Sequence, residues 1–355
     1  MACFGLLAGD VWAQQNQGNQ NQGGGGNRPN QNQNQQNQNQ NQNNQGSTNA
    51  GVIVDAQGVL RRNTVSDPTG MLRRQQVAAA QATLPRELSR PSDLRKVSLT
   101  RLEKAISDNG GVLTDEMRYL AGLQRLRYVF LYPESGDIVI AGPAEGWAPE
   151  ADGRMTGLRS GRPVLQLQDL VVALRAFPPD QTKTPMVGCS IDPTPEGLQA
   201  MQAYLKSVPG VFMAGQQQAV AGRLTEGLRN SLGLQKIRIN GVSPQTHFAQ
   251  VLVEADYRMK LIGIGLEQPP VKMVSFVDTV RPGQVSRNAL FRWYFVPDYQ
   301  CVRLTEDHLA MELVGDGVKL IGEDEMVAGG GQRQAAGRSN KASQTFVTSF
   351  TRKYS

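Results

Sequence analysis

The chain contains few of the residues from which catalytic and metal sites are usually built. Its 355 residues include only two histidines, His247 and His308, and three cysteines. No two of these five lie within four residues of each other, so the ligand spacing of a zinc site is absent. There is also no GxSxG elbow, P-loop or GxGxxG turn in a strand-to-helix context. We therefore expect no metal and no cofactor.

Long apolar runs are also missing. No stretch approaches the roughly 18–20 apolar residues that cross a bilayer, so no transmembrane span is predicted. Only the start resembles a targeting segment, because the apolar run 2–8 is followed by Val11-Trp12-Ala13, the small-residue ending of an export cleavage site. A basic start and a longer apolar core are lacking. We interpret residues 1–13 as the remnant of an export signal; a terminus without function is the alternative.

Residues 14–50 contain no acidic and no aromatic residue and consist mainly of Gln, Asn and Gly. Such a segment cannot bury enough apolar area to offset its chain entropy, so we predict a disordered linker. Because it follows directly after the predicted cleavage site, the two segments together favour export to the periplasm, the cell envelope or the outside of the cell.

Basic residues are unevenly distributed. The net charge is +6, and residues 51–128 hold 13 Lys/Arg against 8 Asp/Glu. This surplus favours an acidic partner or an anionic envelope polymer, whereas export argues against nucleic acid. Ordinary solvated faces are the alternative interpretation. The candidate anion-binding residues are Arg61, Arg62, Arg73, Arg74, Arg95 and Lys96.

The remaining pattern predicts an α+β fold of hairpins and mixed sheets with packed amphipathic helices. Hairpins are expected around DAQG (55–58) and PESGD (133–137), and helices over 70–84 and after Thr194. A capping box at Thr100 and Glu103 predicts another helix start. We divide the chain into a first α+β part (51–180), a second (181–325), and a flexible Gly-rich loop followed by a truncated C-terminal helix (326–355).

Two local patterns predict what is buried. The helix after residue 246 has its apolar positions at helical spacing, with Glu254 and Arg258 on its polar side. Phe291, Trp293 and Phe295 alternate along a strand, which is typical of a buried strand face. A stacking surface for sugars or bases is the alternative for these three rings. The predicted apolar stripe consists of Phe248, Val251, Leu252, Ala255 and Met259.

Cys189, in VGCSID, is the strongest candidate nucleophile. A catalytic thiol needs a base such as His247 or His308 to form the thiolate. Its apolar surroundings are typical of an inert, packed thiol. In an oxidising compartment Cys189 and Cys301 form a candidate disulfide; two free buried thiols are the alternative.

Several segments resemble an exported-protein family of planctomycete bacteria that is classed as a domain of unknown function. They are GVIVDAQGVL, PMVGCSIDPTPEGL, THFAQVLVEADYRMKLIGIGLE, RWYFVPDY and ELVGDGVKLIGEDE. The resemblance covers about 51–355, and THFAQVLVEADYRMK is its most specific part. It implies export, a shared fold, and a sequence that continues beyond FTRKYS, but no catalytic residues. We therefore predict a non-catalytic binding or structural module of the cell envelope with a protein or polymer partner; a Cys/His hydrolase and an anion-binding surface are the alternatives.

Overall fold

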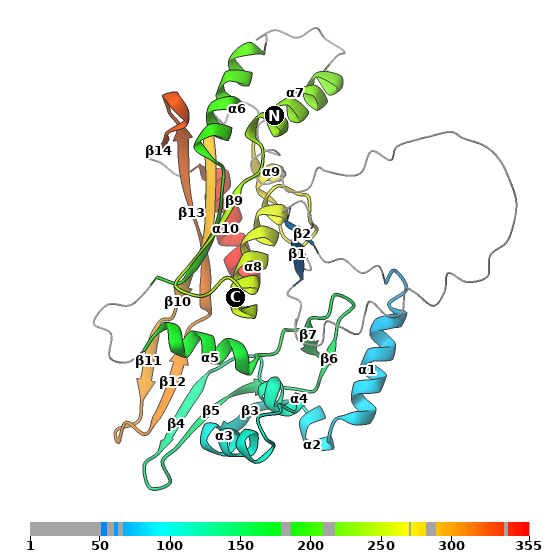
Figure 1. Ribbon diagram of the computed structural model, residues 1–355, viewed down its shortest axis with the longest axis vertical. Coiled ribbons are helices and arrows are strands. Elements are labelled where there is room, and N and C mark those ends of the chain that lie inside the picture. The colour runs from blue at the N-terminus through cyan, green and yellow to red at the C-terminus, as the bar shows by residue number, and fades with distance from the viewer. Residues whose placement is uncertain are drawn as a thin grey trace, which may run out of the picture.

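The computed structural model describes residues 51–54, 60–62, 67–178, 186–208, 217–269, 271–281, 289–336 and 340–354. The predicted export remnant and Gln/Asn-rich linker lie outside these residues, as does the DAQG turn. The fold is α+β, with antiparallel sheets and packed helices (Figure 1), as the sequence predicts. None of the described helices combines the length and the apolar character needed to cross a bilayer.

The largest sheet has five antiparallel strands in the order β11-β12-β4-β5-β3. Its central β4–β5 hairpin confirms the one predicted around PESGD. Gly136 closes that turn with a φ of 62°, a conformation that glycine adopts without strain. The strands are β3 (Ser92–Ser98), β4 (Tyr128–Tyr132), β5 (Asp137–Ala144), β11 (Cys301–Leu304) and β12 (Ala310–Val314).

One face of this sheet is packed against helices. Val97 on β3 and Ile140 on β5 are direct cross-strand partners, and they belong to the same apolar cluster. Leu102 from α3 (Leu99–Asp108) and Leu170 from α5 (Leu167–Ala176) pack against that cluster. Because side chains alternate across a strand, the neighbouring residues of β3, β4 and β5 point to the opposite face.

The start of α3 differs from the predicted capping box. Ser98, not Thr100, is the N-cap, and its hydroxyl accepts the backbone N–H of Arg101 at 3.1 Å. Ser98 is the last residue of β3, so its extended backbone already has the N-cap conformation. Thr100 instead donates its hydroxyl to the carbonyl of Gly136.

A second antiparallel sheet has the order β10-β13-β14. Phe291, Trp293 and Phe295 pack from β10 into the aromatic core, which confirms the buried strand face. The indole N–H of Trp293 donates to Ser343 at 2.8 Å, so this buried polar atom is satisfied. The elements of this core are β10 (Ala289–Asp298), β13 (Gly317–Val327), α8 (His247–Gly263), α9 (Phe276–Thr279) and α10 (Lys341–Tyr354). The third strand of the sheet, β14 (Arg333–Ala335), pairs with β13.

The two sheets are joined by one long ribbon. β10 pairs with β13, and the chain between them forms the β11–β12 hairpin, which extends the five-stranded sheet through β12 and β4. Figure 1 shows the ribbon running from one sheet into the other. The first sheet therefore draws strands from both of the ranges, 51–180 and 181–325, into which the sequence was divided.

A smaller ribbon lies beside α8. It pairs β8 (Gly188–Asp192) with β9 (Lys236–Asn240), and α6 (Pro195–Ser207) and α7 (Gln217–Leu232) lie between them in the chain. Thr194 caps α6 as predicted, accepting the N–H of Gly197 at 3.0 Å.

The buried face of α8 differs from the predicted stripe. Val251 is 41% exposed, whereas Val253, Tyr257 and the charged Glu254 are buried. Glu254 is buried because distant groups meet it: the N–H of Gly51 donates to its carboxylate at 2.9 Å, and Arg154 and Arg258 also pair with it. Helical periodicity predicts that charged residues face the solvent. It contains no information about partners that lie about a hundred residues away in the chain.

The remaining N-terminal elements surround these sheets. β1 and β2 pair as the predicted hairpin, and α1 confirms the predicted helix over 70–84. These elements are β1 (Val52–Val54), β2 (Leu60–Arg62), α1 (Met71–Thr83), α2 (Arg86–Ser89), α4 (Asp115–Arg118), the short 3₁₀ helix η1 (Leu120–Gly122), β6 (Trp147–Pro149) and β7 (Met155–Gly157).

The Gly-rich segment predicted as a flexible loop is structured where it is described. It forms the 3₁₀ turn η2 (Gly329–Gly331) and strand β14, which pairs with β13. Gln202 donates to the carbonyls of Val327 and Ala328, and a Cβ on Gly331 would lie 2.5 Å from the carbonyl oxygen of Pro195. Glycine here permits close packing against α6. The C-terminal helix is present as α10.

Candidate functional site: a polar pocket at the edge of the sheet

Cys189 is a packed thiol. It lies on β8 opposite Ile239 and packs against the cluster of Tyr257 and Leu261. Burial, together with the nearby Asp256 carboxylate, raises the pKa of the Cys189 thiol to about 12. A thiol with this pKa is protonated at neutral pH, so it is a poor nucleophile.

His247 is held by two other side chains. Its Nδ1 lies 2.8 Å from Asp169 Oδ2, and its Nε2 lies 3.4 Å from the amide nitrogen of Gln166. Since the carboxylate accepts from Nδ1, Nε2 is the acceptor for the Gln166 amide. Both ring nitrogens thus connect α8 to the start of α5, which is a structural role.

The second histidine candidate of the Cys/His site and the second cysteine of the candidate disulfide both lie in the β11–β12 hairpin. His308 is in the turn, with a φ of 59°, and Cys301 begins β11. Cys189 and Cys301 are free thiols in different sheets, so the candidate disulfide is not formed. Within the described part of the chain, no group of three or more His, Cys, Asp and Glu residues could hold a metal ion.

Two of the six candidate anion-binding residues, Arg73 and Arg95, bind other parts of the chain. Arg73 donates to the carbonyls of Ala148 and Pro149 and to Thr156, so it ties α1 to the β6–β7 hairpin. Arg95 donates to four backbone carbonyls, and burial lowers its pKa.

The remaining four candidates differ in position. Arg74 is exposed on α1, and Lys96 lies on β3. Arg61 and Arg62 lie in β2, with side chains outside the described residues. Lys96 is therefore the one candidate that lines a described pocket.

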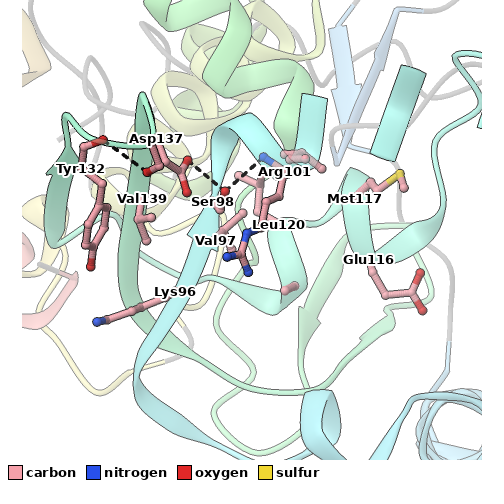
Figure 2. A pocket seen from close by; sticks show the side chains of 13 residues that line it. Lys96, Val97, Ser98, Arg101, Glu116, Met117, Leu120, Tyr132, Asp137 and Val139 are labelled. Atoms are coloured by element: carbon pink, nitrogen blue, oxygen red, sulfur yellow. Dashed lines mark hydrogen bonds between the residues drawn. The ribbon is translucent and has the colours of Figure 1, made fainter. Parts of the chain in front are cut away.

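That pocket, of about 590 Å³, lies where β3, α3, α4, η1 and the β4–β5 hairpin meet (Figure 2). Aliphatic side chains form part of its lining, including Val97, Leu102 and Val139. Figure 2 shows Arg101 reaching from α3 toward the middle of the pocket, with Lys96 and Tyr132 on one side and Glu116 on the other. The pocket thus combines an apolar lining with polar groups from four elements, a typical composition for a ligand site.

Some charged side chains of the pocket already have hydrogen-bond partners, and others do not. Asp137 accepts the Ser98 hydroxyl at 2.9 Å and the Thr100 N–H at 3.3 Å, and these bonds, the one from Ser98 foremost, lower its pKa. Among the described residues, Arg101 and Glu116 have no side-chain partner. Within the described part of the chain, the partner of the Lys96 ammonium is the ring of Phe130, whose centroid lies 4.8 Å away. Two cations and one carboxylate are therefore free to contact a ligand.

The backbone beside the pocket is unusual. Leu120, Ala121 and Gly122 have φ values of 47°, 54° and 80°, so three successive residues lie in the left-handed region. Each non-glycine residue in that region costs free energy, and such costs concentrate at functional sites. Leu120 and Ala121 line the pocket. Sequence reasoning missed Arg101, Glu116 and Tyr132, because only the folded hairpin brings β4 next to α3 and α4.

A buried carboxylate supports the loop that follows β7. Glu145 accepts the backbone N–H groups of Arg159 and Ser160, at 2.9 and 3.0 Å, and also contacts the Ser160 hydroxyl and Gln124. Burial raises its pKa, but the bonds from Ser160, Arg159 and Gln124 outweigh burial and lower it overall. The ionised form therefore stabilises the fold.

Glu145→Gln is expected to lower the free energy of unfolding at pH 7 by about 2 kcal/mol, because one acceptor oxygen becomes a donor facing other donors. A lowered folded pKa means that this stabilisation is complete above about pH 4.5 and is lost as the pH falls through the folded value. Urea unfolding at several pH values should show the two proteins converging in acid. Glu306→Gln, in an exposed turn, is the control. A difference that stays constant between neutral and acid pH would contradict the assignment.

Comparison with known proteins covers only part of the chain. A family model described as "Protein of unknown function (DUF1598)" matches residues 189–276. This range runs from β8 to the start of α9 and includes THFAQVLVEADYRMK, the most specific part of the family resemblance. The pocket lies outside it. No curated protein and no solved structure shows a significant match to the chain. The family match is thus confined to residues 189–276, and the residues that line the pocket precede it in the chain.

Proposed function

We propose that this protein is an exported, non-catalytic binding module of the cell envelope, and that its pocket holds an anionic envelope polymer. The observation that carries the proposal is the pair of cations, Lys96 and Arg101, which line one pocket without a carboxylate partner among the described residues. Both side chains are exposed, so an anionic ligand can reach them and form charge-assisted hydrogen bonds with them.

Export is supported by the sequence. The small-residue ending at Ala13, the uncharged tract 14–50 and the resemblance to an exported planctomycete family all favour it. The hydrolase hypothesis has no such support. The pKa of the Cys189 thiol is about 12, and both nitrogens of His247 are engaged by α5. Binding is therefore the function that the geometry favours.

The proposal predicts polyanion binding that depends on both cations. The full chain should bind polyglutamate and polygalacturonate, and Lys96→Ala/Arg101→Ala should weaken both interactions by about tenfold for each cation lost. Isothermal titration calorimetry at two salt concentrations measures this, and binding should weaken as salt screens the charges.

The matched control is Arg74→Ala/Arg175→Ala, which removes the same charge from exposed positions on α1 and α5. It should bind as the unmodified protein does at equal salt. An equal loss in both double variants would show that net charge alone governs binding and would contradict a role for the pocket. Absence of binding to either polymer would refute the proposal.

A further inference from the structure

Three aromatic residues form a row that leads out of the pocket. Tyr128, Phe130 and Tyr132 alternate along β4, so they lie on one face of the five-stranded sheet. The rings of Tyr128 and Phe130 stack with centroids 6.2 Å apart and planes 24° apart. Tyr132 lines the pocket itself and is 44% exposed. The row thus continues the pocket along the sheet.

This aromatic row lies on the face opposite to the apolar cluster of the helices. Val97 and Ile140 are in register with Val129, and all three point toward α3 and α5. Tyr128 and Phe130 are neighbours of Val129 on β4, so they point the other way. Both side chains are half-buried. Neither belongs to the aromatic core around Trp293 or to the apolar cluster under α3 and α5.

A cation lies over each of two rings in this row. Lys96 lies over Phe130, and Arg127 lies over Tyr128 with its guanidinium carbon 5.3 Å from the ring centroid. Arg127 also pairs with Glu312 on β12, which Arg303 on β11 contacts from the other side. The Glu312 carboxylate is therefore shared between two arginines. Among the described residues, Lys96 has no acidic partner where it lies over Phe130. Two rings of β4 therefore each have a cation over them, Lys96 from β3 and Arg127 from the residue before β4.

From this pairing of rings with cations we infer that the anionic polymer is an acidic polysaccharide, an inference that rests on the proposed function. A pyranose ring has an apolar C–H face that packs on an aromatic ring, and each uronic acid unit adds one carboxylate for a cation. Glu116 favours a polymer that carries hydroxyl groups. Its carboxylate lines the pocket, where it can accept hydrogen bonds from sugar hydroxyls. Tyr132 is the stacking ring, and Lys96 and Arg101 bind the carboxylates.

The test compares two polycarboxylates that differ in rings. Polygalacturonate carries a carboxylate on every sugar ring, whereas polyglutamate carries carboxylates and no ring. The full chain should bind polygalacturonate more tightly at equal salt. Tyr132→Ala should weaken polygalacturonate binding by about fivefold and leave polyglutamate binding unchanged. Tyr132→Phe should bind as the unmodified protein does, because it keeps the ring. Tyr299→Ala, which removes a 51% exposed ring outside β4, is the control.

The outcomes separate the inference from the proposed function. If both polymers bind equally and Tyr132→Ala changes neither, the polysaccharide is refuted while anion binding by Lys96 and Arg101 stands. If neither polymer binds, the polysaccharide inference and the proposed function are both refuted. Tighter binding of a single-stranded oligonucleotide than of polygalacturonate would overturn the inference in favour of base stacking. Circular dichroism of each variant confirms that the fold is retained before binding is compared.

Discussion

Replacing Glu254 with alanine is expected to lower the free energy of unfolding by about 3–5 kcal/mol, because removing one member of a buried ion pair leaves its partners without compensation. The Glu254 carboxylate is buried on α8. It accepts the Gly51 N–H at 2.9 Å and pairs with Arg154 and, at 3.0 Å, with Arg258. The alanine variant would leave three donors facing a cavity.

The partners of Glu254 belong to separate parts of the chain, which explains the size of the effect. Gly51 directly precedes β1, and Arg154 lies in the turn between β6 and β7. After the substitution Arg258 keeps Glu267 at 2.7 Å, whereas Arg154 keeps only Asp152 at 3.5 Å. A Cβ on Gly51 would lie about 2.5 Å from Arg154 and Glu254, so the site is also closely packed.

Urea unfolding of Glu254→Ala and Glu254→Gln measures this effect. Glutamine keeps the shape and loses the charge, so it should cost less than alanine. Glu226→Ala, on the exposed side of α7, should change the unfolding free energy by less than about 0.5 kcal/mol. If Glu254→Ala costs no more than Glu226→Ala, the ion pairs contribute nothing and the interpretation is wrong.

Phe346→Ala is expected to cost about 3–5 kcal/mol, because it opens a cavity in the aromatic core that surrounding side chains fill only partly. Phe346 is fully buried on α10, with its ring centroid 4.7 Å from that of Trp293 and 5.8 Å from that of Phe350. Since α10 packs on β13 and α9, the loss should loosen the whole helix.

The readouts are the urea midpoint and Trp293 fluorescence, which should shift to longer wavelength as water gains access. Thr348→Ala, on the exposed face of the same helix, is the control and should leave both unchanged. A midpoint equal to that of the control would show that α10 contributes little to the stability of the core.

Local patterns predicted most of the elements correctly. The alternation in RYVFLY and the turn residues of PESGD are sufficient for a hairpin. Thr194 and Pro195 define a helix start by themselves. These features involve neighbours in the chain, so one sequence contains the information needed to find them.

The features that the sequence did not predict depend on contacts between segments that are distant in the chain. Arg73 and Arg95 resemble surface cations in the sequence, but backbone carbonyls of other segments bind them. Glu254 lies on a nominally polar helix face and is buried. The pocket is another such feature, since Arg101 and Tyr132 come from a helix and a strand that meet only in the folded chain. The alternation of Tyr128, Phe130 and Tyr132 was the one local signal that could have indicated it.

The ribbon that joins the two sheets also limits how this chain can be recombined in evolution. A crossover near residue 180 would pair one parent's β4 with another parent's β12, which are hydrogen-bonded neighbours. The register Ala310↔Phe130 would then have to match between unrelated halves. Because a slip of one residue turns every side chain to the other face, most such chimaeras would expose the apolar side of the sheet. The strand partners on the two sides of residue 180 are therefore inherited together.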